Sequence, residues 1–183
     1  GADKLRSFLK VGVHSDVEVT SRDWGHDVKV PSLFSPSHTV NQVFSSACSV
    51  AYSDNNTPGL WQTLGQLILE ASYEATLLEA IRQAARHGYK GASKIVYLTL
   101  VGGGVFGNDI TWLKESIIRA CDLFRDVDLD VRIVMFGGTK AKNWGFWSRM
   151  IGEFDTMAPG PGFGQAPAPA QGAGQYAVGD SIQ

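Results

Sequence analysis

Apolar residues recur at two spacings along the chain, and each spacing predicts one type of secondary structure. Valines alternate with polar residues over Val11–Thr20, which is typical of a β-strand with one polar face. Apolar residues recur every three or four positions over Thr57–Gly88, which predicts a long amphipathic helix that ends at Gly88. The same spacing predicts a second helix over residues 110–124.

Three further segments are predicted to be strands. Thr39–Tyr52 is rich in small, β-branched and aromatic residues and is interpreted as a buried strand. Ile95–Val101 is apolar at successive positions, so we expect it in the interior of a sheet with helices on both faces. Val131–Phe136 is the last strand. The alternation of helices and strands predicts right-handed parallel crossovers and hence a layered α/β domain.

Glycine and proline are unevenly distributed over the 183 residues. Residues 158–179 contain four of the seven prolines and no charged side chain. Such a segment has too little apolar bulk to offset the entropy of ordering it. We therefore expect one folded domain over residues 1–157 and a flexible tail over residues 158–183.

Charge and cysteine content exclude several classes of protein. The net charge of −2 argues against nonspecific nucleic-acid binding, and no apolar run approaches the roughly 20 residues that cross a bilayer. Cys48 and Cys121 are too few for a disulfide framework or a cysteine zinc site, so a reducing, cytoplasmic compartment is expected. His14, His26 and His38 match no metal-ligand spacing, so neither a metal nor a cofactor is predicted. The oligomeric state is left open.

A cluster of glycines directly follows the apolar strand Ile95–Val101, at positions 102, 103, 104 and 107. Ligands in open α/β sheets bind beyond the carboxyl ends of the strands, where glycines allow close approach and helix amides donate to anions. Residues 102–108 therefore predict a phosphate-binding loop; the alternative is a tight turn that binds nothing. The dinucleotide fingerprint does not fit, because no acidic residue ends the next strand. A P-loop does not fit either, because no Lys-Ser/Thr pair follows Gly107.

The order of these elements resembles a known family. The run Val96–Asn108, followed by a helix and Val131–Phe136, resembles the second half of a macrodomain, the ADP-ribose-binding module. The resemblance is strongest over residues 39–137. Three segments resemble, more narrowly, the divergent group that includes arginine-specific ADP-ribosyl hydrolases: residues 11–20, 39–47 and 70–77. The resemblance implies a three-layer α/β/α sandwich with a mixed, largely parallel sheet, or only the C-terminal part of that fold. The asparagine-rich catalytic loop of a macrodomain's first half has no counterpart between residues 1 and 38.

The resemblance also implies a ligand site. Phe106 would cover the distal ribose of ADP-ribose, and the loop around it would wrap the diphosphate. The implied ligand-binding residues are Gly102, Gly103, Gly104, Val105, Phe106, Gly107 and Asn108. ADP-ribose enters as ligand or product, on its own or attached to a modified protein.

Removal of ADP-ribose from a side chain breaks a glycosidic bond, and a carboxylate base assists the attacking water. The polar face of the first strand carries the best candidates, which are His14, Asp16 and Glu18, with Asp16 as the first choice of base. The alternative is that these residues only form the solvated face of a strand.

The leading hypothesis is thus a macrodomain-type ADP-ribosyl hydrolase that acts on ADP-ribosylated protein, with arginine as one candidate acceptor. A first alternative is a module of the same fold that binds ADP-ribose without turnover. A second is a nucleotide-binding fragment that a missing segment or a partner chain completes.

Overall fold

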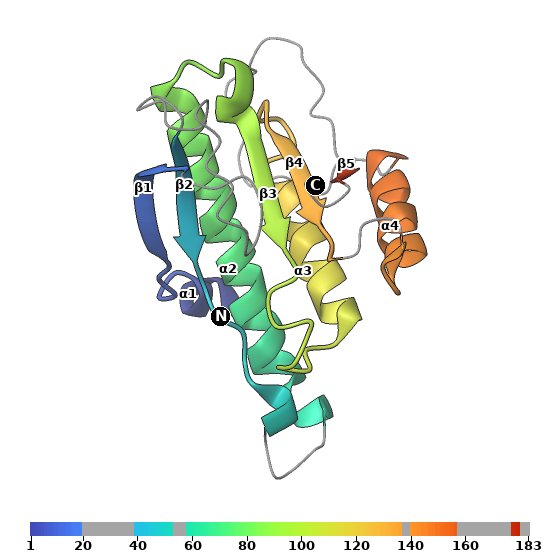
Figure 1. Ribbon diagram of the computed structural model, residues 1–183. Coiled ribbons are helices and arrows are strands. Elements are labelled where there is room, and N and C mark those ends of the chain that lie inside the picture. The colour runs from blue at the N-terminus through green and yellow to red at the C-terminus, as the bar shows by residue number, and fades with distance from the viewer. Residues whose placement is uncertain (20–38, 53–57, 137–139, 157–176, 180–183) are drawn as a thin grey trace.

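The computed structural model describes residues 1–19, 39–52, 58–136, 140–156 and 177–179. Helices and strands alternate along the chain, so the predicted α/β class is confirmed (Figure 1). In order, the elements are α1 (Ala2–Arg6), β1 (Gly12–Glu18), β2 (Thr39–Phe44), a 3₁₀ turn (Val50–Tyr52), α2 (Pro58–Arg86), a second 3₁₀ turn (Gly91–Lys94), β3 (Ile95–Thr99), α3 (Ile110–Leu123), β4 (Asp130–Val134), α4 (Trp144–Thr156) and β5 (Ala177–Gly179).

The described strands form two separate sheets. β1 and β2 form an antiparallel pair, and β3, β4 and β5 form a parallel sheet in that order. The parallel pairing of β3 with β4, joined through α3, is the predicted crossover. β2 makes no ladder with β3 in the described part of the chain. The structure therefore shows small sheets rather than one continuous sheet.

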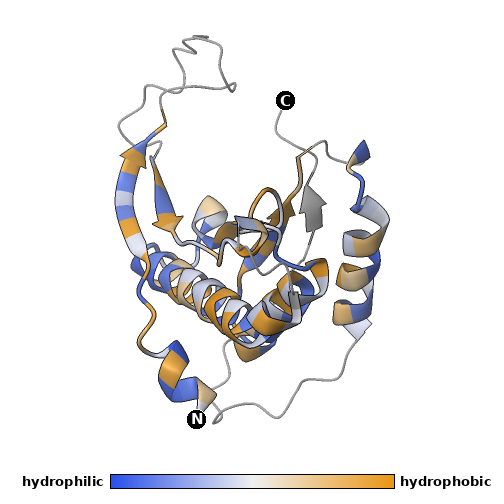
Figure 2. Ribbon diagram, turned by 90° about the horizontal axis from the view of Figure 1, so that it is seen from below, coloured by the Kyte–Doolittle hydropathy of each residue, from blue (hydrophilic) through white to orange (hydrophobic). Residues whose placement is uncertain are grey.

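Helix α2 is the long element that connects the two sheets. It ends at Arg86, and Gly88 follows in the left-handed region with φ of +63°, as the stop signal predicts. Figure 2 shows α2 and α3 on the same side of the strands. Polar bonds tie α2 to three other elements: Glu70 accepts from Arg6 of α1, Glu74 from Arg119 of α3, and Glu79 from Asn41 of β2.

One face of β3 is open, contrary to the prediction that helices cover both. Val96 and Leu98 are buried against the helices, whereas Tyr97 is 49% exposed and Thr99 is also exposed. The sequence pattern does not show this exposed face, because tyrosine counts as apolar although it can keep its ring half-buried and its hydroxyl in water. Within the described residues, β3 alternates between a core face and a solvent face.

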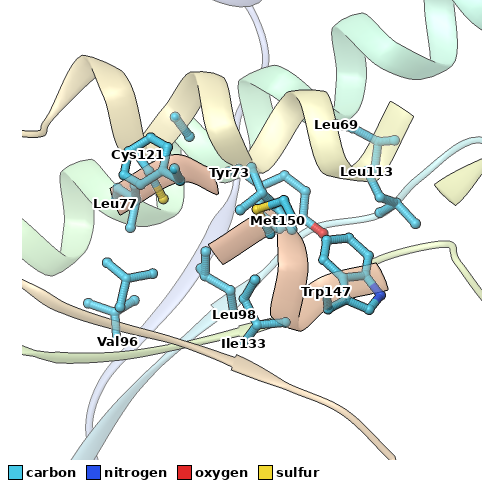
Figure 3. Packing of buried hydrophobic residues seen from close by; sticks show 14 of the residues in the cluster. Leu69, Tyr73, Leu77, Val96, Leu98, Leu113, Cys121, Ile133, Trp147 and Met150 are labelled. Atoms are coloured by element: carbon cyan, nitrogen blue, oxygen red, sulfur yellow. The ribbon is translucent and has the colours of Figure 1, made fainter. Parts of the chain in front are cut away.

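The core lies between the helices and the inner face of β3 and β4 (Figure 3). Trp147 of α4 is completely buried in it, next to side chains of α2 and α3. Figure 3 shows Leu69 and Tyr73 of α2 and Leu113 of α3 in the same cluster. This packing holds α2, the end of β3 and the start of α3 as one body.

The remaining segments differ from expectation in detail. The strand predicted over Thr39–Tyr52 ends at Phe44, and its residues alternate between half-buried and exposed instead of being buried. Of the predicted tail, Ala177–Gly179 forms β5 and pairs with β4. The rest of residues 158–183 lies outside the described residues.

Candidate functional site

The glycine loop lies where it was predicted, between the end of β3 and the start of α3. Two tight turns shape it: the amide of Gly103 donates to the carbonyl of Leu100 at 3.1 Å, and that of Gly107 to the carbonyl of Gly104 at 3.0 Å. Gly102 and Gly107 have φ of +76° and +69°, a region that residues with a Cβ rarely adopt. The sequence at these two positions is thus dictated by the backbone.

Three of the four glycines are also required by packing. A Cβ on Gly102 would lie 2.4 Å from Cβ of Ala47, one on Gly103 2.8 Å from Leu113, and one on Gly107 2.9 Å from Ala51. Gly104 is different, because a Cβ added there would meet no atom within 4 Å. The tight-turn interpretation accounts for Gly102, Gly103 and Gly107, but not for Gly104.

Asn108 fastens the loop and is not free to bind a ligand through its amide nitrogen. Its Nδ2 donates to the carbonyl of Cys48 at 2.7 Å and to the carbonyl of Gly102 at 3.2 Å, and its backbone amide donates to Gly102 at 3.0 Å. The side chain is only 5% exposed. Its Oδ1 has no hydrogen-bond partner among the described residues and lies beside Gly65 of α2. Asn108 therefore has a role in fixing the loop, and its contact with a ligand stays a prediction.

The tip of the loop carries unused hydrogen-bond donors. Within the described part of the chain, the backbone amides of Gly104, Val105 and Phe106 have no partner. Gly104 and Val105 are exposed and Phe106 is half-buried, so this stretch of the loop lies at the surface. Successive amides in a turn, held in place by surrounding structure, form a concavity suited to an anion.

The N-terminus of α3, in contrast, is already occupied. Asp109 caps the helix: its Oδ1 accepts from the amide of Thr111 at 2.7 Å and from the Thr111 hydroxyl at 2.6 Å. A carboxylate at this place engages one of the helix donors and repels a second anion. The loop tip is therefore the more favourable place for a phosphate, and the role expected of the helix amides stays a prediction.

An aromatic pair lies beside the loop. The rings of Tyr52 and Phe106 contact edge to face with centroids 6.1 Å apart, and the amide of Ala51 donates to the carbonyl of Phe106 at 3.0 Å. Tyr52 is 68% exposed. The sequence analysis did not identify Tyr52. The available signal was its position in the segment that follows β2, because ligands of α/β folds bind beyond the carboxyl ends of the strands.

The predicted catalytic residues do not share one face of β1. His14 pairs with Gln42, and Glu18 pairs with Thr39. Gln42 and Thr39 are three residues apart on β2, so their partners lie on opposite faces. The cause is a bulge between His14 and Val17, where β1 has one residue more than β2. The interpretation of one polar carboxylate face is wrong.

Asp16 sits in this bulge, with φ of +56°. Its amide donates to Oδ1 of Asn41 at 2.9 Å, and its carboxylate lies 3.8 Å from the guanidinium of Arg86. Asp16 is exposed, and so are His14 and Glu18. These contacts explain the side chain as part of the surface between β1 and the end of α2.

The structure does not bring Asp16 and the glycine loop together. Asp16 lies at Arg86, whereas Asn108 lies at Gly65, and 21 residues separate these two positions of α2. Asn41, which accepts from the amide of Asp16, also bonds Glu79, 14 residues from Gly65. At 1.5 Å per residue, the two sites are thus about 20–30 Å apart along the helix. Figure 1 shows β1 and the loop after β3 in different regions of the molecule. A base at Asp16 would not reach a ligand held by the loop.

The described residues offer little evidence for a metal site, a reactive thiol or a membrane-spanning helix. They contain no group of three or more potential metal ligands, and His26 and His38 lie outside them. Burial raises the pKa of Cys48 and raises that of Cys121 to about 12, so both thiols are poor nucleophiles. None of the described helices is long and apolar enough to cross a membrane.

Comparison with known proteins gives no match: no family model, no curated protein and no solved structure is similar to the chain.

Proposed function

We propose that this protein binds a nucleoside diphosphate, with ADP-ribose as the first candidate, at the tip of the glycine loop. The observation that carries the proposal is the set of unpartnered amides at Gly104, Val105 and Phe106, in a loop whose shape is fixed from both sides. Each charge-assisted hydrogen bond to a phosphate oxygen contributes about 1.5–3 kcal/mol. Three such bonds would contribute about 4.5–9 kcal/mol before the entropic cost of association is subtracted.

The surroundings of these amides favour a ligand with phosphate and sugar groups. The open side of Gly104 leaves room for phosphate oxygens close to the backbone. Phe106 and Tyr52 present apolar ring surface next to the amides, which suits the face of a ribose. The resemblance to macrodomains assigns the diphosphate and the distal ribose to the same loop.

Binding without turnover fits the geometry better than hydrolysis does. A hydrolase needs a carboxylate at the anomeric carbon, and the predicted base Asp16 is about 20–30 Å away along α2. Residues 100–109 contain one carboxylate, that of Asp109, and it caps the N-terminus of α3. We therefore propose a binding module for ADP-ribose or ADP-ribosylated protein, the first alternative considered from the sequence.

Titration calorimetry with ADP-ribose, ADP and AMP tests this function. We expect one ADP-ribose per chain, and loss of binding in Gly104→Leu, whose new side chain would cover the loop tip. Gly145→Leu is the matched control, because Gly145 also has open space around its Cβ position but lies in α4. Absence of heat with all three nucleotides would contradict the proposal.

A turnover assay separates binding from hydrolysis. We expect no release of ADP-ribose from ADP-ribosylated arginine by the wild-type protein. Release that Asp16→Ala abolishes would restore the hydrolase hypothesis with Asp16 as its base.

A further inference from the structure

The glycine loop is framed by segments that carry no charged side chain. It bonds the carbonyl of Cys48 in the segment after β2 and lies against Gly65 of α2. Figure 1 shows the start of α2 and the loop after β3 at the same end of the molecule. Residues 39–52, 58–69 and 95–108 contain no aspartate, glutamate, lysine, arginine or histidine. A phosphate at the loop tip would therefore meet backbone dipoles, and no basic side chain, in these three segments.

The first charged residue after the loop is acidic. Asp109 is exposed, and its Oδ1 accepts from the amide and the hydroxyl of Thr111. Among the described residues, its carboxylate forms no ion pair. Because Phe106 and Asp109 are three residues apart, their Cα atoms are separated by at most about 11 Å. This distance is similar to the screening length of about 8 Å at physiological ionic strength, so the carboxylate repels negative charge at the loop tip.

The basic side chains closest to the loop in sequence belong to neighbouring elements. Lys114 of α3 donates to Glu153 of α4 at 3.4 Å, and its Nζ lies 5.7 Å from the ring centroid of Phe146. Lys140 and Lys142 follow β4 and are exposed, and neither forms an ion pair with another described residue. Of the charged residues, Asp109 alone is joined directly to the loop.

Nucleoside diphosphates fall into two classes that differ in charge. In a diphosphate that is esterified at both ends, as in ADP-ribose, each phosphate carries one negative charge. A free terminal phosphate, as in ADP, carries about −1.5 to −2 at pH 7, because its second ionisation lies near pH 6. The second class therefore brings up to one more negative charge to the loop tip.

We propose that Asp109 is a specificity-determining residue, which makes the loop select a diphosphate esterified at both ends over one with a free terminal phosphate. The three amides of the loop tip attract both classes, and the carboxylate penalises the additional charge of the second. This inference rests on the proposed function. It makes charge, in addition to contact with the distal sugar, a basis of discrimination.

Titration calorimetry of the full chain with ADP and with its β-methyl ester tests the inference. The two probes share base, ribose and both phosphates, and the methyl group removes only the terminal charge. At pH 7.5 and about 20 mM ionic strength, we expect the ester to bind about two- to four-fold more tightly. Raising the ionic strength to about 0.3 M screens the repulsion, so this preference should shrink.

A matched pair of variants assigns the preference to one residue. Asp109→Asn removes the charge and keeps an oxygen that caps α3 equally well, so the preference should fall to about one-fold because ADP binds more tightly. Asp126→Asn removes the same charge from an exposed residue beyond the other end of α3, whose 14 residues span about 21 Å. This variant should keep the preference of the wild type.

The outcomes separate this inference from the proposed function. No heat with ADP-ribose would overturn both. If ADP-ribose binds, equal affinity for the two probes, or a preference that persists in Asp109→Asn, would overturn only the role of Asp109. The salt dependence of the wild type decides the question if Asp109→Asn is unstable. Tighter binding of ADP than of its ester, lost in Lys140→Ala, would also overturn the inference, because a lysine would then hold the terminal phosphate.

Discussion

The carbonyl oxygen of Gly102 accepts two hydrogen bonds from Asn108, one from its backbone amide at 3.0 Å and one from its Nδ2 at 3.2 Å. These bonds close the loop after β3 into a ring. Because Nδ2 also reaches Cys48, the same side chain joins this loop to the segment that follows β2. The amides at the loop tip therefore stand on a framework that is fixed before any ligand arrives.

Replacement of Asn108 by alanine should lower the free energy of unfolding by about 1–3 kcal/mol, the cost of a buried acceptor without a partner. The carbonyl of Cys48 loses its side-chain donor, whereas that of Gly102 keeps the backbone amide of residue 108. Urea denaturation of the two proteins measures the difference. A loss below about 1 kcal/mol would show that Asn108 does not hold the loop.

Alanine should lower the stability of the protein strongly at Gly102 and hardly at all at Gly104. Gly102→Ala forces a Cβ into the left-handed region and to within 2.4 Å of Ala47, so we expect a loss of about 3 kcal/mol. Gly104→Ala should change stability by less than about 0.5 kcal/mol, because its Cβ meets open space. Thermal unfolding of both variants checks this contrast, and equal losses would contradict the described packing.

The ion pair of Glu79 should make stability depend on pH. Hydrogen bonds from Arg82 lower the pKa of Glu79 in the folded state from its usual value of 4.5. A lowered folded pKa contributes stability that is present above the unfolded pKa and is lost as the pH falls through the folded pKa. The stability difference between wild type and Glu79→Gln should therefore shrink as the pH falls from 7 to 3. In an Arg82→Gln background, most of this dependence should disappear; its persistence there would assign it to another group.

The thiol of Cys121 should report the opening of the core. Burial raises its pKa to about 12, so almost none of it is thiolate at pH 8 in the folded protein. In a Cys48→Ser variant, a thiol reagent should react in denaturant and remain almost unreactive under native conditions. Rapid native labelling would mean that α3 does not pack as the structure describes.

The long helices and their ends could be predicted from the sequence, because the 3.6-residue period and Gly88 are local signals. The bulge at Asp16 could not. The valines of β1 alternate as they would in a regular strand, and the bulge becomes visible only in the pairing of His14 with Gln42 and of Val17 with Val40. That one extra residue separated the predicted catalytic residues into two faces.

The position of the glycine loop could also be predicted from local sequence, but the roles of its individual residues could not. Asn108 was predicted to bind ligand, yet its partner Cys48 is 60 residues away in the sequence. The spacing between Asp16 and the loop depends on the length of α2 and on which end of it each one contacts. Such relationships come from tertiary packing, which neither periodicity nor residue type encodes.

The most direct test of the proposed site is a ¹H–¹⁵N NMR titration of the full chain with ADP-ribose. We predict saturable shifts of the amide resonances of Gly104, Val105 and Phe106, with smaller changes at Gly103 and Gly107, whose amides already have partners. Shifts that cluster around Asp16 and Arg86 and leave the loop unchanged, or no shifts at all, would contradict the assignment of this loop as a diphosphate site.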